Sequence, residues 1–222
     1  MHTKSRAALQ RALGKKAKLD GGRLHVPSDP DPQRLAEVLA EVEVVDLVLG
    51  FVSAAWWKSA NKIAGLERLT RLAMLSWDTK QVQLVRGLAK VSLPQLQELR
   101  IGLLGDGAMS TLGALELPAL HHLAIGGGGY GVRLTAKGVR ALAASPLGKQ
   151  LVTLELGRCE ITPAIASLVT RMKRLERFAA SYGEVDATES ALRERFGRGF
   201  VIEDEPSFDY LLLGVRGISR SR

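Results

Sequence analysis

The chain has 222 residues, of which 46% are hydrophobic and 24% charged, a composition typical of a folded globular protein. Its single cysteine excludes an intramolecular disulfide, and no apolar run is long enough to cross a membrane or to act as a signal core, so we expect a cytoplasmic protein. The net charge of +8 gathers at the ends, because residues 1–23 carry seven basic residues against one acidic and residues 214–222 carry three basic residues and no acidic one.

In chain order, the first expected elements are a short strand at 24–26 and a capped helix at 29–40, which opens with Asp29-Pro30-Asp31-Pro32. Strand cores of the form apolar-x-x-apolar-x-apolar then recur at intervals of 24 to 31 residues. There are six: Val44/Leu47/Leu49, Leu69/Leu72/Met74, Leu96/Leu99/Ile101, Leu120/Leu123/Ile125, Leu151/Leu154/Leu156 and, degraded, Leu175/Phe178/Ala180.

Between the strand cores the apolar period changes from two toward 3.6, which indicates helices. The clearest runs over 135–144, with Thr135 as its cap and Ser145-Pro146 as its stop. Another covers 161–169, where Thr162 is the cap and Pro163 takes the first helical position. A terminal strand is expected at 200–202 and a second at 210–213.

One stretch carries a specific repeat signature. Leu151-Val-Thr-Leu-Glu-Leu-Gly-Arg-Cys-Glu-Ile161 matches the pattern L-x-x-L-x-L-x-x-N/C-x-L at every specified position. With the helical segment 134–146 before it, this stretch resembles bacterial cytoplasmic leucine-rich repeat proteins of the ribonuclease-inhibitor type, and 192–197 resembles the ending common in such arrays. The periodic match covers about residues 44 to 180.

The resemblance implies an α/β solenoid of about six repeats, with a curved parallel sheet on the concave face and helices on the convex face. It also implies binding of macromolecules without catalysis. The ninth repeat position departs from the family pattern, since only Cys159 conforms among Val52, Trp77, Leu104, Gly128, Cys159 and Gly183. We expect a basic, partly disordered tail over 1–23, the capped solenoid over 24–202, and a C-terminal flank with a basic tail over 203–222.

The positions between the inward leucines predict the binding surface, because they flank the leucines on the concave sheet face. They are polar and mixed in sign: Asp46, Arg71, Gln97, Glu98, Arg100, His121, His122, Thr153, Glu155, Glu176 and Arg177. We therefore predict a non-catalytic scaffold that binds a protein partner through this face. Mutual pairing of these charges is the plainer interpretation, and an adaptor that uses the basic termini on nucleic acid or an anionic surface is the alternative.

Signals for chemistry are weak. Gly126, Gly128 and Gly131 spell G-x-G-x-x-G, but they fall in the longest repeat and predict a rim loop around Gly128 and Tyr130 rather than a dinucleotide enzyme. His121 and His122 lack further ligands at metal-binding spacing, and Cys159 is expected to be a buried turn residue. We expect no catalytic residue, no metal and no cofactor.

The three tryptophans gather in the first two repeats. Trp56, Trp57 and Trp77 predict either an aromatic hot spot for a partner or filler between repeats, and the sequence leaves both open.

Overall fold

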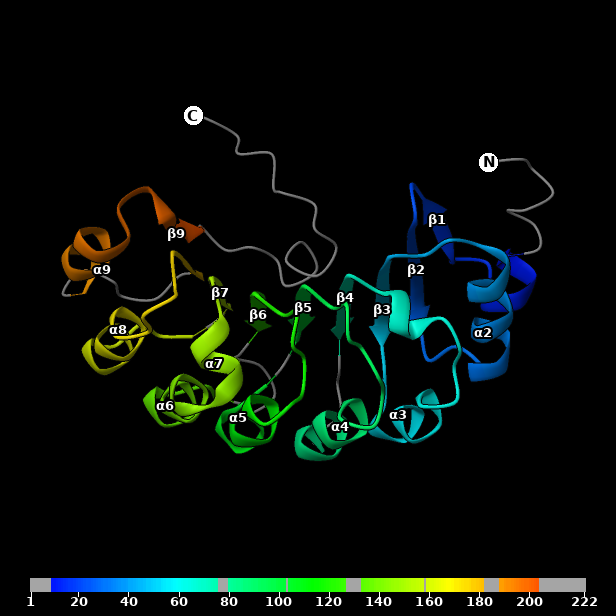
Figure 1. Cartoon of the computed structure of the whole chain (residues 1–222), viewed down its shortest axis with the longest axis horizontal. Coiled ribbons are helices and arrows are strands. Elements are labelled where there is room, and N and C mark those ends of the chain that lie inside the picture. The colour runs from blue at the N-terminus through cyan, green and yellow to red at the C-terminus, as the bar shows by residue number, and fades with distance from the viewer. Residues whose placement is uncertain are drawn as a thin grey trace. The chain divides into compact units, whose positions relative to one another are not determined.

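The protein is an α/β protein whose strands lie in chain order, β1 to β9, in a mostly parallel sheet (Figure 1). The computed structural model describes residues 9–75, 80–102, 104–126, 133–157, 159–181 and 188–203. The expected α/β class is confirmed. Each of the six predicted strand cores overlaps one strand between β3 and β8.

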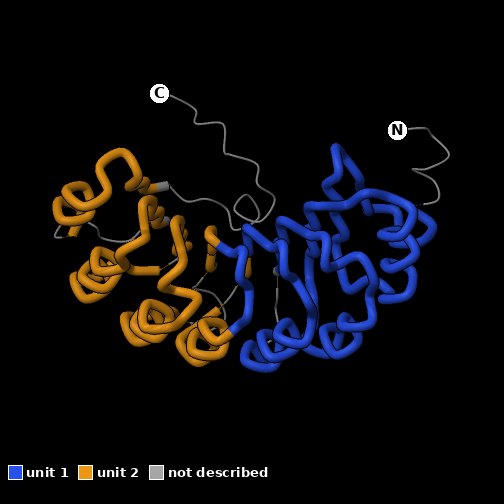
Figure 2. The backbone as a smooth tube through the Cα atoms, in the orientation of Figure 1, with its two compact units in different colours: residues 1–99, 115–120 blue, residues 100–114, 121–222 orange. Residues whose placement is uncertain are grey.

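The chain divides into two compact units (Figure 2). Unit 1 comprises residues 1–99 and 115–120, and unit 2 comprises residues 100–114 and 121–222. The elements of unit 1 are β1 (Lys18–Asp20), β2 (Arg23–Ser28), α2 (Pro32–Glu41), β3 (Asp46–Phe51), α3 (Ala54–Ala60), the 3-10 turn η1 (Leu66–Arg68), β4 (Arg71–Leu75), α4 (Gln81–Leu88) and the first half of β5 (Glu98–Ile101).

Unit 1 begins with a folded segment. β1 pairs antiparallel with β2, while β2, β3 and β4 are parallel. Leu9, Leu13 and Ala17 are buried, so the described part of 1–23 is packed against the rest of unit 1 rather than forming a loose tail. The predicted strand at 24–26 is the centre of β2, and the helix predicted at 29–40 is α2.

Unit 2 contains the second half of β5 and the remaining elements. They are α5 (Asp106–Gly113), β6 (His122–Gly126), α6 (Ala136–Ala144), α7 (Pro146–Gln150), β7 (Thr153–Gly157), α8 (Pro163–Thr170), β8 (Arg177–Ser181), α9 (Glu189–Phe196), the 3-10 turn η2 (Gly197–Gly199) and β9 (Phe200–Glu203). β6 to β9 are parallel. The terminal strand predicted at 200–202 is therefore present as β9, and the one predicted at 210–213 lies outside the described residues.

Side-chain alternation places the core on one face of the strands. In unit 2, Leu154 and Leu156 are at most 1% exposed and Phe178 is fully buried, and helices α5, α6 and α8 lie along that side (Figure 1). These helices contribute buried residues such as Met109, Leu142 and Ile165. Since side chains alternate across a strand, the residues between the buried ones face away from the helices.

The predicted helix caps are confirmed. Thr135 accepts a hydrogen bond from the backbone N–H of Lys137, and Thr162 accepts one from that of Ile165. Ser145 ends α6 and also caps α7, because its hydroxyl accepts from the N–H of Gly148 at 3.0 Å. These caps satisfy backbone donors that have no partner within the helix.

Two aspartates tie the starts of α3 and α6 to earlier parts of the chain. Asp29 accepts from the N–H and hydroxyl of Ser53, and Asp106 accepts from the N–H and hydroxyl of Thr135 and from the N–H of Gly138. Burial would raise the pKa of Asp106, but these hydrogen bonds and the charge of Lys137 outweigh it and hold the pKa below its ordinary value. Asp29 thus links the segment before α2 to the start of α3, and Asp106 links α5 to the start of α6.

Candidate interaction surface

The sheet face opposite the helices carries rows of charged side chains at the amino ends of the strands. In unit 1, Arg23, Asp46 and Arg71 are register partners on β2, β3 and β4. Arg23 pairs with Asp46 at 3.6 Å, and Arg71 pairs with Glu98 at 3.4 Å. The charges of this row alternate in sign and neutralise one another. Mutual pairing, the plainer interpretation of the predicted residues, therefore describes this row.

A recurring backbone contact fixes these rows. The carbonyl of the residue just before one strand accepts hydrogen bonds from two successive N–H groups at the start of the next strand. In unit 1 the carbonyl of Thr70 binds Gln97 and Glu98, and in unit 2 the carbonyl of Val152 binds Glu176 and Arg177. Because register and alternation follow from this contact, the predicted residues stand side by side on the same face.

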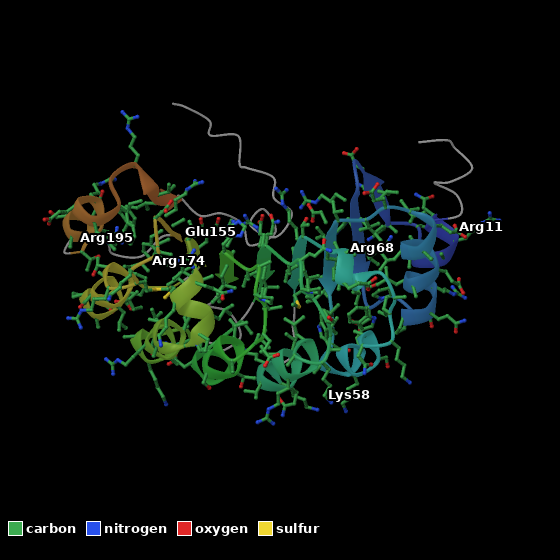
Figure 3. The ribbon with its side chains drawn as sticks, in the orientation of Figure 1. Arg11, Lys58, Arg68, Glu155, Arg174 and Arg195 are labelled. Carbon is green, nitrogen blue, oxygen red and sulfur yellow. The ribbon has the colours of Figure 1, made fainter. Side chains whose placement is uncertain are left out.

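In unit 2 two of the predicted residues, Arg100 and His122, contact Glu155 of β7, which Figure 3 labels. Its Oε2 accepts from Nη1 of Arg100 at 3.1 Å, and its Oε1 lies 2.8 Å from Nε2 of His122. All three side chains are only 17–19% exposed. Arg177 also acts on the Glu155 carboxylate through its charge. We call Arg100, His122, Glu155 and Arg177 the Glu155 cluster.

A small residue makes the Glu155 cluster possible. Ala124 of β6 is the register partner of Glu155, and β6 lies between β5, which carries Arg100, and β7. Ala124 is only 5% exposed although it faces away from the helices, because the Arg100–Glu155 pair spans it. Sequence reasoning missed Ala124, whose only signal is an alanine at an outward-facing strand position.

The electrostatics of the Glu155 cluster favour an ionised carboxylate. Burial alone would raise the pKa of Glu155. The hydrogen bond with His122 and the charges of Arg100, His122 and Arg177 outweigh burial and lower the pKa below its ordinary value. The carboxylate is therefore charged at neutral pH and organises the two arginines around it.

We expect Glu155→Gln to lower the free energy of unfolding by about 1–3 kcal/mol at neutral pH, because it removes a charged acceptor and leaves its donors poorly matched. The folded-state pKa is lowered, so the stabilisation is present above the ordinary value of 4.5 and is lost as the pH falls through the folded-state pKa. Urea unfolding of the parent and the variant between pH 7 and pH 3 should show that the difference between their free energies of unfolding shrinks in acid. A difference that stays constant over this pH range would contradict the stabilising role of the ionised Glu155.

The other predicted site residues lie at the edges of this arrangement. Thr153 is the register partner of His122 on one side and of Arg177 on the other. His121 and Glu176 are exposed residues just before β6 and β8. The structure thus brings Arg100, His122, Glu155 and Arg177 together in unit 2 and Arg71 with Glu98 in unit 1.

The tryptophans described by the structure are packed inside unit 1. Trp56 and Trp57 are 6% and 1% exposed and meet edge to face, and Nε1 of Trp56 donates to the carbonyl of Pro30 at 2.6 Å. Burial favours the filler interpretation for both. Trp77 lies outside the described residues. Val45 and Phe51, at 36% and 40%, are large hydrophobic residues of unit 1 that remain exposed.

The weak chemical signals receive little support from geometry. Gly126 ends β6, whereas Gly128, Tyr130 and Gly131 lie outside the described residues. Cys159 is buried, its Sγ donates to the carbonyl of Leu134, and burial followed by the charges of Asp106 and Glu160 raises its pKa to about 12. That thiol stays protonated and is a poor nucleophile. Over the part of the chain that the structure describes, no three His, Cys, Asp or Glu residues gather as a metal site would require.

Comparison with known proteins finds similarity to solved structures only. No family model matches the chain, and no curated protein is significantly similar to it. A Bacteroides fragilis protein, whose crystal structure was a target of the Northeast Structural Genomics Consortium, is similar with a TM-score of 0.39 and 13% identity, over 76% of this chain and 69% of that chain. Among the described helices, none has the length and apolar character needed to cross a bilayer.

Proposed function

We propose that this chain is a bacterial, cytoplasmic leucine-rich repeat protein of about six repeats, and that it binds a protein partner without catalysis. The binding surface is the sheet face opposite the helices. The observation that carries the proposal is the set of polar and charged side chains that the strands present on that face, where the sequence signature expected them. Repeat arrays use such a continuous face for macromolecular recognition.

The sign of the charges favours a protein partner over a polyanion. A phosphate backbone needs a run of cations, whereas arginines alternate with carboxylates along the row of unit 1. In unit 2 a carboxylate stands at the centre of the Glu155 cluster. A surface of mixed sign matches the mixed surface of another protein and gives specificity through charge complementarity.

The test is affinity capture from a nuclease-treated lysate, with the full chain as bait. The Arg71→Glu/Arg177→Glu variant changes one exposed arginine on the sheet face of each unit. The matched control, Lys58→Glu/Arg140→Glu, makes the same charge change at exposed positions of α3 and α6. Lys58 is labelled in Figure 3. We expect the control to retain the partner and the sheet-face variant to lose it. Retention by both variants would refute the proposed surface.

The runner-up is an adaptor that associates with nucleic acid or an anionic surface through its basic termini. One observation favours it: residues 1–23 carry seven basic residues against one acidic residue. Replacing Lys4, Arg6, Lys15 and Lys16 by glutamine in the full chain separates the two functions. Capture that depends on these residues and disappears with nuclease would support the adaptor.

A further inference from the structure

We propose that unit 2 carries a second binding surface, which contacts the phosphodiester backbone of a double-stranded nucleic acid. The inference goes beyond the proposed function, because this surface shares no residue with the predicted sheet-face set. It lies just before β8 and β9 in the chain, and its basic residues are all exposed. Figure 3 labels two of them, Arg174 and Arg195. We call the whole set the basic edge: Arg171, Lys173, Arg174, Arg195 and Arg198.

The turn between α8 and β8 holds three of these cations outward. The turn is anchored by Met172 and Leu175, which are both buried, and the N–H of Leu175 donates to the carbonyl of Met172 at 3.1 Å. Its exposed residues are Arg171, Lys173 and Arg174. Because the backbone of the turn is already fixed, a ligand has to order only the side chains of these residues, which lowers the entropic cost of binding.

Arg195 of α9 joins the turn through two hydrogen bonds. Its Nε donates to the carbonyl of Thr170 at 3.3 Å, and its Nη2 donates to the carbonyl of Leu175 at 3.1 Å. Thr170 is the last residue of α8, so the guanidinium also complements the carboxyl end of that helix. Carbonyl oxygens carry no net charge, and the positive charge of Arg195 therefore adds to that of the turn.

The 3-10 turn η2 brings Arg198 to the same place. A Cβ at Gly199 would lie 2.3 Å from the carbonyl oxygen of Glu176, so the backbone of η2 approaches the end of the α8–β8 turn more closely than a side chain would allow. Arg198 directly precedes this contact and is exposed. The α8–β8 turn, α9 and η2 thus present their cations on one continuous surface.

The cations of the basic edge outnumber the acids beside them. Two exposed glutamates, Glu176 and Glu194, lie next to it in the chain. Among the residues that the structure describes, neither glutamate forms an ion pair with the basic edge. Five positive charges stand against two negative ones, which leaves a surplus of 5 − 2 = 3. A run of cations of this kind is what a phosphate backbone needs.

The apolar residues at the basic edge offer nothing to other partners, because Met172, Leu175 and Phe196 are all buried. A protein interface needs an apolar centre, and a peripheral membrane anchor needs apolar side chains that enter the bilayer. Phosphates are bound through charge alone and need neither. The exposed chemistry of the basic edge therefore favours a nucleic acid.

Contact is expected with phosphates rather than with bases. The guanidinium of Arg195 lies 4.9 Å from the centre of the Phe196 ring, and that of Arg193 lies 5.6 Å from the centre of the Phe200 ring. Both rings belong to buried residues, so bases cannot stack on them as they do on single-strand-binding surfaces. We therefore expect binding of a duplex without sequence preference.

The experiment measures fluorescence anisotropy of a labelled DNA duplex of about 16 base pairs with the full-length protein, between about 50 and 200 mM salt. The logarithm of the parent's binding constant should fall against the logarithm of salt concentration with a slope of about −3 to −4, which corresponds to about four phosphate contacts. An RNA duplex of the same sequence should give a similar slope, since both backbones present the same phosphates.

Two variants and a matched control locate the contact. Lys173→Gln/Arg174→Gln should make the slope shallower by about two units and weaken binding roughly tenfold or more at about 50 mM salt, and Arg171→Gln should make it shallower by about one unit. The control, Arg86→Gln/Lys90→Gln, also removes one arginine and one lysine from exposed positions and should leave the slope unchanged. Thermal unfolding should be the same for all of these proteins, because the replaced side chains are exposed.

Three outcomes would overturn the basic edge as a nucleic-acid surface. Slopes that are equal in the parent and in both basic-edge variants would remove these residues from the contact. Binding that is lost when Lys4, Arg6, Lys15 and Lys16 become glutamine, but survives Lys173→Gln/Arg174→Gln, would assign it to the amino terminus. A polyaspartate peptide that binds as tightly as the duplex would assign the basic edge to an acidic protein. None of these results touches the sheet-face proposal, whose capture test uses a nuclease-treated lysate and different residues.

Discussion

Replacing Phe178 by alanine is expected to lower the free energy of unfolding by about 3–5 kcal/mol, the range for deleting a buried phenyl ring. Phe178 is fully buried on β8. Its ring stacks on Phe200 at 6.0 Å with an interplanar angle of 6° and meets Phe196 at 6.0 Å. The substitution therefore removes the centre of a three-ring cluster that joins β8 to α9 and β9.

Hydrogen exchange distinguishes this loss from a general weakening of the protein. In Phe178→Ala, the amides of α9 and β9 should lose protection first, because their packing depends most directly on that ring. Phe178→Leu is the control, since it keeps most of the apolar volume and should lower the free energy of unfolding less than Phe178→Ala does. Protection of α9 and β9 that matches the parent would show that other contacts hold the carboxy-terminal elements.

The strands were predictable because their signal is local. An apolar-x-x-apolar-x-apolar core fixes which side chains turn inward, so even the degraded core at 175–180 correctly marked Phe178 as buried. Its partners were not predictable, since Phe196 and Phe200 reach it only through the path that the chain takes after β8. Caps such as Thr135 and Thr162 were recognisable for the same local reason.

The candidate surface was predictable as a set of positions but not as a set of contacts. Glu155 and Arg100 were both expected on one face, yet they are 55 residues apart in the chain and meet only because Ala124 is small. Asp29 and Asp106 were missed for a related reason. Each binds the capping residue of a helix, Ser53 or Thr135, 24 to 29 residues further along, and nothing in the local sequence specifies that distance. Pairings of this kind depend on register, which no single segment encodes.

Gly148→Ala should be the second severe substitution, because overpacking should lower the free energy of unfolding by about 2–3 kcal/mol. Gly148 lies in α7, where its N–H donates to the hydroxyl of Ser145, and that hydroxyl donates to the carbonyl of Leu142 at 2.6 Å. A Cβ at position 148 would lie 2.0 Å from the oxygen of the same carbonyl. An alanine therefore forces the backbone of the α6–α7 junction apart, and with it the hydrogen bonds that Ser145 makes to both helices.

The control for Gly148→Ala is Gly107→Ala, in the same unit and also in a helix. A Cβ at Gly107 meets nothing within 4 Å, so alanine should stabilise α5 by about 0.5–1 kcal/mol through helix propensity alone. Denaturant unfolding of both variants separates overpacking from helix propensity. The two variants share the same chemical change and differ in the space around the new methyl group. Equal effects at the two positions would mean that the α6–α7 junction relaxes at little cost. Opposite signs would show that the close approach of the two helices, rather than the conformational freedom of glycine, requires Gly148.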